Sequence, residues 1–305
     1  MEPLIPPHPR GGPIVKSSGT NASCEALILQ APRVFEALQI FVQRSLPLLP
    51  ADISLASLTH VLDVGCGRHL WGRALFHAML EQAGPDLIAD VRIDGIEICH
   101  EIVQAARTTL RTAREQVLIS QGNLLNLPAE SENRYQLVHM RFLALSLPPF
   151  SWSQALAQLY RVCAPGGTVI WLEPSLPTPS DKALGWNQWL RWIAQAVATQ
   201  GGSPSIDQSM DAIFQQAGPW MKLHREIIPV PLLPPTRIQG SLLPDQLQTL
   251  SSWIFELRPW LEQSGIPANQ LAKGLSQVLD ELNSRRIIST WPWTVMTGTK
   301  PTGRR

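Results

Sequence analysis

The sequence predicts an α/β protein with a mostly parallel β-sheet that helices cover on both faces. Between residues 60 and 174, short apolar segments alternate with longer amphipathic segments, and glycine or proline marks many of the boundaries. Strands that alternate with helices pair in parallel, with right-handed crossovers. The chain has 305 residues, 44% of them hydrophobic, which suffices for one large domain with a cap or for two small domains.

Seven strands are expected from apolar runs that turn residues or helices bound. The fifth follows a Pro-Gly-Gly turn at 165–167, and the sixth and seventh lie in the last third of the chain. The predicted strands are residues 60–65, 91–98, 117–123, 135–140, 168–174, 220–232 and 287–301.

Helices are expected where apolar residues recur with helical spacing. Gly84 followed by Pro85 is a typical helix end, and Ser151 or Ser153 can cap the start of another helix. The predicted helices are residues 32–46, which Pro47 ends, and residues 71–84, 100–116, 151–164, 184–202, 205–219, 244–263 and 267–288.

Composition narrows the function classes. The net charge of +1 gives no basic field for nucleic acid, and no polybasic run favours an anionic membrane. No segment is apolar and long enough to span a bilayer, and the N-terminus lacks the apolar core of a signal peptide. Cys24, Cys66, Cys99 and Cys163 lack zinc-site spacing, so no metal is expected. We expect a cytoplasmic protein with a small-molecule partner, without nucleic acid or membrane; a homodimer stays open.

The sequence VLDVGCGRHLWG at 61–72 predicts a strand that runs into a glycine turn, the usual place for a cofactor in such sheets. A P-loop is excluded because its Lys and hydroxyl residue are missing. A dinucleotide turn fits weakly: Gly65 and Gly67 match its first two glycines, but Leu70 stands at the third.

Five segments resemble, in family order, the class I S-adenosylmethionine-dependent methyltransferases. They are VLDVGCG, DGIEIC, QGNLLNLP, YQLVHM and LYRVCAPGGTVIWLEP, within residues 58–175. The resemblance implies a Rossmann-like seven-stranded sheet whose last strand is antiparallel, with a helical lid, and S-adenosyl-L-methionine as the cofactor.

The resemblance also implies cofactor contacts. Gly65, Cys66 and Gly67 would let the backbone approach the methionine part and ribose. Asp63 would order the turn's amides and help to hold the amino end, and Glu97 would accept both ribose hydroxyls. Each carboxylate also has a simpler interpretation: Asp63 as a helix cap and Glu97 as a solvated strand end.

The adenine side of the site would include Ile98, Asn123 and Leu124. The family usually has Asp where Asn123 stands, so the bond to the adenine amino group would lose its charge. Asn123 can also be only a turn residue.

Arg68 and His69 depart from the family, which keeps small residues after the second glycine. We expect His69 to avoid a positive φ if the turn opens slightly. Arg68 either pairs with the methionine carboxylate or points to solvent. These two residues are where a weakened grip on the cofactor would arise.

His139, near the end of the fourth strand, is the candidate for a catalytic base. It can equally contact the cofactor or be bonded in the loop that follows. Arg141 either contacts the methionine carboxylate or is exposed, and Glu173 either meets the substrate or shapes the connection after it. The fourth strand is not followed by an Asn-Pro-Pro-Tyr-type motif, which argues against methylation of an amino group on a nucleic-acid base.

The predicted domains are a flexible segment at 1–23, a helical cap at 24–57, the cofactor core at 58–175, and a remainder at 176–305 with a lid at 244–288. Trp186 and Trp189 are candidates for an aromatic wall at the substrate, with core packing as the alternative. The chain is expected to methylate a small apolar or aromatic metabolite at oxygen, nitrogen or carbon. Alternatively, it binds S-adenosylmethionine without methylating.

Overall fold

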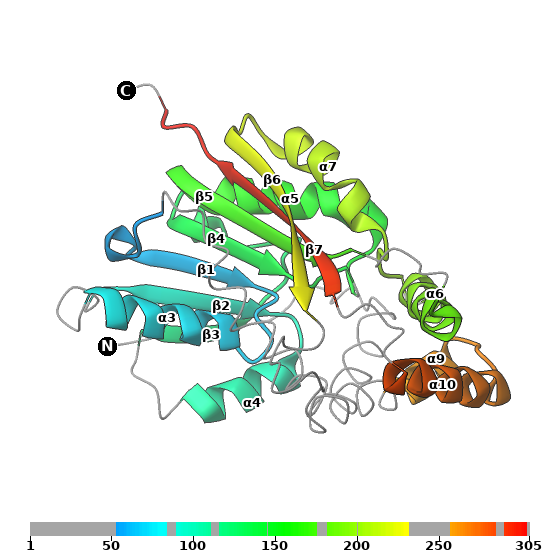
Figure 1. Ribbon diagram of the computed structural model, residues 1–305. Helices are drawn as coiled ribbons and strands as arrows, with labels where there is room; N and C mark the ends of the chain where they lie inside the picture. The colour runs from blue at the N-terminus through cyan, green and yellow to red at the C-terminus, as the bar shows by residue number, and fades with distance from the viewer. Residues whose placement is uncertain are drawn as a thin grey trace, which may run out of the picture.

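Seven strands form a single sheet in the order β3-β2-β1-β4-β5-β7-β6 (Figure 1). The computed structural model describes residues 53–83, 90–110, 116–144, 146–175, 182–199, 201–231, 257–284 and 290–303. The strands are β1 His60–Val64, β2 Arg92–Glu97, β3 Val117–Gln121, β4 Tyr135–Arg141, β5 Cys163–Pro174, β6 Met221–Pro231 and β7 Thr290–Thr299.

The first five strands are parallel, and β7 lies antiparallel between β5 and β6. Strand order reverses at β1, because β2 lies on one side of it and β4 on the other. Ligands of open α/β sheets bind at such a reversal, beyond the carboxyl ends of the strands. The predicted fold class, including the antiparallel last strand, is confirmed.

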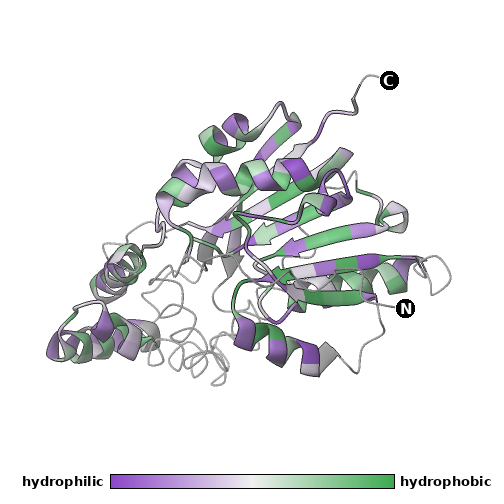
Figure 2. Ribbon diagram, turned by 180° about the vertical axis from the view of Figure 1, so that it is seen from behind, coloured by the Kyte–Doolittle hydropathy of each residue, from purple (hydrophilic) through white to green (hydrophobic). Residues whose placement is uncertain are grey.

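Helices cover both faces of the sheet (Figures 1 and 2). On one face, α3 and α4 pack against Val61 and Ile93; on the other, α5 and α7 pack against Leu62 and Val138. Neighbouring strand residues point to opposite faces, and β1 is buried from Val61 to Val64 because both faces are covered. The helices are α3 Leu70–Ala83, α4 His100–Leu110, α5 Trp152–Val162, α6 Leu184–Thr199, α7 Met210–Ala217, α9 Arg258–Gln263 and α10 Ala268–Asn283.

A third apolar cluster joins α6, α9 and α10, and we call these three helices the helical cluster. It lies on the side of the sheet where the parallel strands end, in both views (Figures 1 and 2). Glu281 of α10 accepts from two backbone amides in the first turn of α6, Gly185 N at 2.7 Å and Trp186 N at 2.8 Å. These contacts fasten two helices that lie almost a hundred residues apart in the sequence.

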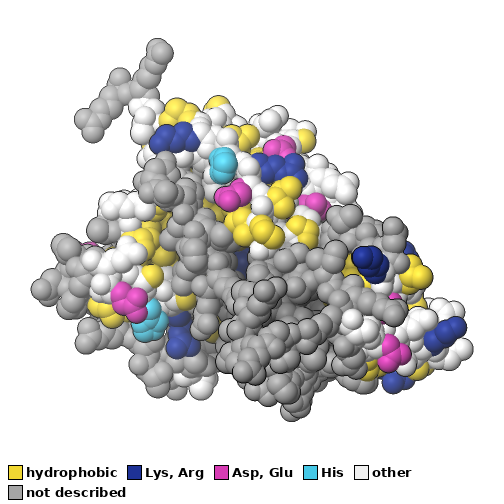
Figure 3. All heavy atoms as spheres, in the orientation of Figure 1, with side chains coloured by type: hydrophobic (Ala, Val, Ile, Leu, Met, Phe, Trp, Pro, Cys, Tyr) yellow, Lys and Arg dark blue, Asp and Glu magenta, His cyan; other side chains and the backbone are white. Residues whose placement is uncertain are grey.

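The edge strand β6 exposes Met221, Leu223 and Ile227, and hydrophobic side chains are visible over this strand in Figure 3. Its pairing with β7 is irregular between Met221 and His224, and Pro229 lies in its second half. Irregular pairing and proline both hinder the addition of another strand to an edge.

The start of the fifth strand differs from the prediction. The Pro-Gly-Gly turn at 165–167 is part of β5, where the register with β4 shifts between Tyr135 and Leu137 and Gly166 has a φ of 79°. The turn is therefore an irregularity within β5, and the strand continues on both sides of it. Of the helix predicted at 244–263, the described residues include α9. Of the cap predicted at 24–57, they include residues 53–57. Residues 1–23 lie outside them. Among the helices described, none has the length and apolar character needed to cross a membrane.

Candidate cofactor site

The turn between β1 and α3 has three residues with positive φ: Gly65 at 62°, Gly67 at 54° and His69 at 57°. A Cβ on Gly65 would lie 2.6 Å from Leu143 Cδ2, so a larger residue would have to displace this side chain as well as adopt a positive φ. The expectation that His69 avoids a positive φ is wrong. The chain enters α3 directly after it, and histidine is among the residues that tolerate this backbone region.

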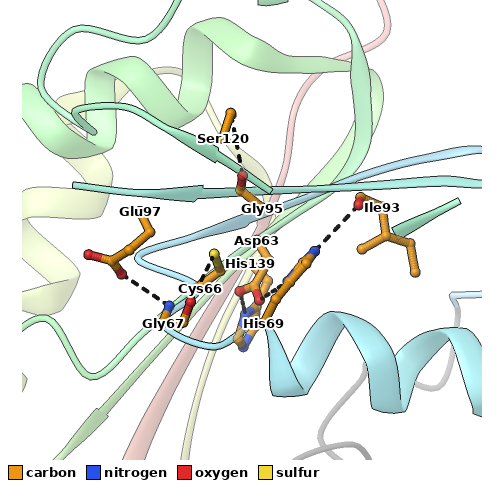
Figure 4. A network of polar contacts seen from close by, with 9 residues as sticks. All are labelled: Asp63, Cys66, Gly67, His69, Ile93, Gly95, Glu97, Ser120 and His139. Atoms are coloured by element: carbon orange, nitrogen blue, oxygen red, sulfur yellow. Dashed lines mark hydrogen bonds and ion pairs between the residues drawn. The ribbon is translucent and has the colours of Figure 1, made fainter. Parts of the chain in front are cut away.

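The amides of this turn bond to the end of β2. Gly65 N and Cys66 N donate to the Ile96 carbonyl at 2.8 and 3.2 Å. Gly67 N donates to Glu97 Oε2 at 3.0 Å (Figure 4). The expectation that Asp63 orders these amides is therefore wrong, because the acceptors come from the neighbouring strand.

Glu97 is positioned by two backbone donors. Besides Gly67 N, Cys99 N donates to Oε1 at 3.0 Å. Burial raises the pKa of this carboxyl, and the amide donors partly oppose that shift. A carboxylate has about four lone-pair sites, so Glu97 keeps acceptor capacity on both oxygens for a ligand.

Asp63 lies below the turn, between two imidazoles (Figure 4). His139 Nδ1 is 2.8 Å from Asp63 Oδ1, and His69 Nδ1 is 3.1 Å from Asp63 Oδ2. All three side chains are buried. Burial alone would raise the pKa of Asp63, but the bonds to both imidazoles outweigh it and hold the pKa well below its usual value. The carboxylate is thus ionised at the base of the turn.

His139 is enclosed. Its ring stacks on Trp71 with centroids 3.7 Å apart, and its Nε2 has no hydrogen-bond partner among the described residues. Burial lowers the pKa of His139, against the effect of Asp63. With Nδ1 donating to Asp63, Nε2 is the unprotonated nitrogen. A general base has to reach its proton, and this nitrogen does not face solvent.

Glu173, at the end of β5, fixes the loop that follows β4. Leu143 N and Trp171 Nε1 donate to Oε1 at 2.9 and 3.1 Å, and Ala144 N donates to Oε2 at 3.1 Å. The side chain is fully buried. Burial raises its pKa to about 7, although these donors and Arg141 act in the opposite direction. Its contacts are those of a residue that shapes the connection.

Arg141 is the last residue of β4, one position beyond the pair Val64–Met140. No hydrogen bond or ion pair occupies its guanidinium within the part of the chain that the structure describes. Burial lowers its pKa, while Asp63 and Glu173 oppose that shift. Arg141 is a half-buried cation beside the turn.

The loop after β3 carries Asn123, whose Oδ1 accepts from Leu125 N at 2.9 Å. This is the turn role that the sequence allowed, and the side chain is exposed. Leu124 is buried, whereas Ile98, after β2, is 45% exposed. Ile98 therefore offers apolar surface near the end of the strand.

Trp186 and Trp189 lie in α6 and are buried within the helical cluster. These contacts agree with core packing, the alternative to an aromatic wall at the substrate. Arg68 is exposed at the tip of the turn. Of the predicted site residues, the structure brings together those at the turn and the neighbouring strand ends: Asp63, Gly65, Cys66, Gly67, Arg68, Glu97 and His139. Both tryptophans instead pack within the helical cluster. In the described ranges, no group of three or more His, Cys, Asp or Glu side chains could hold a metal ion.

Sequence reasoning missed the burial of His69. Two signals were present: glycines stand inside a helix at position 72 and inside a strand at position 95, where glycine is unfavourable. A Cβ at Gly95 would lie 2.9 Å from His69 Nε2, and one at Gly72 would overlap its Cε1. Isolated glycines of this kind mark a close approach by another group.

A family model described as a methyltransferase domain matches residues 32–218. Among curated proteins, the demethylmenaquinone methyltransferase of Lactiplantibacillus plantarum is 33% identical over 153 residues, 50% of this chain and 59% of that protein. That of Shouchella clausii is 30% identical over 121 residues, 39% of this chain and 47% of that protein. The matches thus span about half the length of these relatives.

Two solved structures show overall similarity. Phosphoethanolamine N-methyltransferase 2 of Haemonchus contortus is 14% identical, with 80% of this chain and 49% of that chain covered and a TM-score of 0.47. The YcgJ protein of Bacillus subtilis is 15% identical, with 88% and 100% covered and a TM-score of 0.48. At these scores, neither likeness supports an inference about the site.

Proposed function

Because the chain belongs to the methyltransferase-domain family, we propose that it transfers a methyl group from S-adenosyl-L-methionine to a small apolar or aromatic acceptor. One observation carries this proposal. At the reversal of strand order, the positive-φ glycine turn after β1 and the Glu97 carboxylate at the end of β2 are bonded to each other. An amide-rich turn beside a carboxylate suits a ligand that has both a polar amino-acid end and a ribose diol.

The residues present fit this cofactor. Gly65, Cys66 and Gly67 would line its methionine half and ribose, and Glu97 would accept from the ribose hydroxyls with its remaining lone pairs. Ile98 would cover one side of the adenine, with Asn123 and Leu124 at its far end. When bound, the cofactor supplies a methyl group activated by a sulfonium, so the protein has to align the reactants and exclude water.

Arg141 and Arg68 are the two candidates for the methionine carboxylate. We favour Arg141, because its guanidinium is half-buried and has no bond to a described residue, while Arg68 is exposed. A guanidinium can bind a carboxylate with two parallel bonds, which fixes its orientation. Asp63 would influence the conformation of the turn through its bond to His69.

The acceptor would lie between the turn and the helical cluster, which includes the described part of residues 244–288. This cluster is found beyond the carboxyl ends of the parallel strands (Figure 1). The curated relatives are named for demethylmenaquinone, and we propose an apolar acceptor of comparable character. Trp186 and Trp189, which are buried in the helical cluster, would support the side of the cluster that faces the acceptor. The predicted domain boundaries, with the core at 58–175, remain part of the proposal.

Binding without methyl transfer is the second candidate. The enclosed Nε2 of His139 favours it, because the base expected from the sequence does not face a substrate. Acceptors that need no base, such as an unprotonated amine, remain compatible with methyl transfer.

We further propose a cytoplasmic protein that acts on a small molecule rather than nucleic acid, as a monomer or homodimer. The three cysteines that the structure describes, Cys66, Cys99 and Cys163, are free thiols, which suits a reducing compartment. The net charge of +1 gives no general attraction to nucleic acid.

Calorimetry with S-adenosylmethionine tests the cofactor. We expect binding to the wild type, about tenfold or more weaker binding by Glu97→Ala, and little change in Glu101→Ala, whose carboxylate is exposed. No heat with the wild type, or equal affinity in Glu97→Ala, would refute the assignment. Labelled methyl transfer to demethylmenaquinone and to a metabolite extract then separates the two candidates: tight binding with no label transferred would leave only the second.

A further inference from the structure

The His69 side chain occupies a space that two glycines leave open. Its imidazole is fully buried between α3 and β2. A Cβ at Gly95 would lie 2.9 Å from its Nε2, and a Cβ at Gly72 would overlap Cε1. Glycine in a helix or strand interior lowers stability, so each position bears a cost that the neighbouring ring accounts for.

The imidazole also links elements of the site. Nδ1 bonds to Asp63 of β1, and Nε2 lies 3.4 Å from the Ile93 carbonyl of β2. Through the other oxygen of Asp63, the same network reaches His139 of β4, which stacks on Trp71 in the first turn of α3. His69 is the member of this network that belongs to the turn itself (Figure 4).

The two halves of the turn are held differently. The first half, Gly65 to Gly67, is bonded by its amides to Ile96 and Glu97 of β2. The second half has one backbone bond across the turn, from His69 N to the Cys66 carbonyl at 2.8 Å, and the buried side chain of His69. Arg68, between them, is exposed. The imidazole is thus the side-chain anchor of the second half.

We propose that His69 is a positioning residue: by bonding to Asp63 in the space left by Gly72 and Gly95, it holds the turn ready for the amino-acid end of S-adenosylmethionine. This inference rests on the proposed function for its ligand. His69 contacts Asp63 rather than the reacting atoms.

Removal and return of the imidazole test the proposal. His69→Gly removes the ring while the backbone can keep its positive φ. We expect at least tenfold weaker binding of S-adenosylmethionine by calorimetry, and recovery of most of it when millimolar imidazole is added. Imidazole should change neither the wild type nor His69→Phe. In turnover, KM for the cofactor should rise more than kcat falls.

Gly72→Ala gives an independent test. In the wild type its Cβ displaces the imidazole, so we expect weaker cofactor binding. In the His69→Gly background the same substitution should cause no further loss, because the space is empty. Additive losses in the double variant would overturn the proposal.

Hydrogen exchange of the 65–69 amides without cofactor separates this inference from the proposed function. Exchange should be faster in His69→Gly and slow again with imidazole, whether or not the wild type binds S-adenosylmethionine. If the wild type binds and the folded His69→Gly protein binds equally well, the inference fails and the function stands. If His69→Gly does not fold, His69→Asn replaces it, because Asn tolerates this backbone conformation and can donate to Asp63. If His69→Asn binds S-adenosylmethionine with wild-type affinity while its 65–69 amides exchange quickly, the proposal is also refuted.

Discussion

Asp63 and Glu173 are two buried carboxylates on opposite sides of β4, and their surroundings give them opposite acidities. Asp63 lies between two imidazoles, and its pKa is held well below its usual value. Glu173 receives three neutral N–H donors, and burial raises its pKa to about 7. Burial is similar, so the kind of partner decides which carboxylate stays charged.

The difference has opposite consequences for stability against pH. The pKa of Asp63 is lower in the folded state, so its contribution is present at neutral pH and is lost as the pH falls below 3.8 toward the folded pKa. The pKa of Glu173 is higher in the folded state, so its contribution is complete below 4.5 and is lost as the pH rises toward 7. The surroundings of Asp63 therefore favour its ionised form, and those of Glu173 favour its protonated form.

The largest effect is expected for Asp63→Ala. Both imidazoles lose their acceptor in a buried environment, and we expect a loss of about 3–5 kcal/mol in the free energy of unfolding. Urea denaturation at pH 7 measures it. The control is Asp211→Ala, whose partly exposed pair with Arg225 should contribute about 1 kcal/mol or less. Similar losses in both variants would remove the distinction between buried and exposed carboxylates.

Glu173→Gln should alter the pH dependence of stability. A rise of the pKa from 4.5 to about 7 corresponds to on the order of 3 kcal/mol lost by the wild type between those pH values. Gln cannot ionise, so the decline attributable to this residue should disappear, although its amide meets the Ala144 N–H unfavourably. Denaturation at pH 4.5, 5.5, 6.5 and 7.5 checks this. An unchanged slope in the variant would contradict the raised pKa.

Arg141→Met should affect both carboxylates, because the guanidinium acts on each. Without the cation, the pKa of Glu173 should rise further, moving the decline in stability to higher pH. If Arg141 binds the methionine carboxylate, S-adenosylmethionine should bind about tenfold more weakly. The decarboxylated analogue should then show no such loss, and Arg141→Lys should fall between. Equal losses for both ligands would exclude Arg141 as the carboxylate partner.

The smallest effect is expected for Trp189→Phe in the helical cluster. Trp189 Nε1 is buried with no partner among the described residues, so losing this N–H offsets part of the lost packing. We expect about 1.5 kcal/mol or less in the free energy of unfolding and unchanged affinity for S-adenosylmethionine. Weaker cofactor binding would show that the helical cluster helps to set the site.

The strands and the family were accessible from the sequence because they depend on local patterns. Apolar runs such as 135–140 become strands wherever both faces are covered, and the motif order within 58–175 predicted the methyltransferase-domain family, which the family match confirms. The glycine positions of the turn were likewise visible, since Gly65 and Gly67 have a positive φ, which glycine adopts more readily than residues with a Cβ.

The side-chain directions at the turn were not accessible. Whether His69 points outward or under the turn depends on space supplied by Gly72 in the next helix and Gly95 in another strand. Asn123 had two plausible roles, and its bond to Leu125 N arises from a loop conformation that sequence spacing does not fix. These features depend on contacts between separate elements.

The insertion of β7 between β5 and β6 has a consequence for the order of assembly. During translation β6 emerges before the strand that is its neighbour in the sheet, and Glu281 reaches α6 only after α10 has been made. The nascent chain therefore leaves the edges of β5 and β6 that face β7 unpaired until the ribosome has released β7. Such unpaired edges favour aggregation, so this part of the sheet is where a chaperone would be needed most.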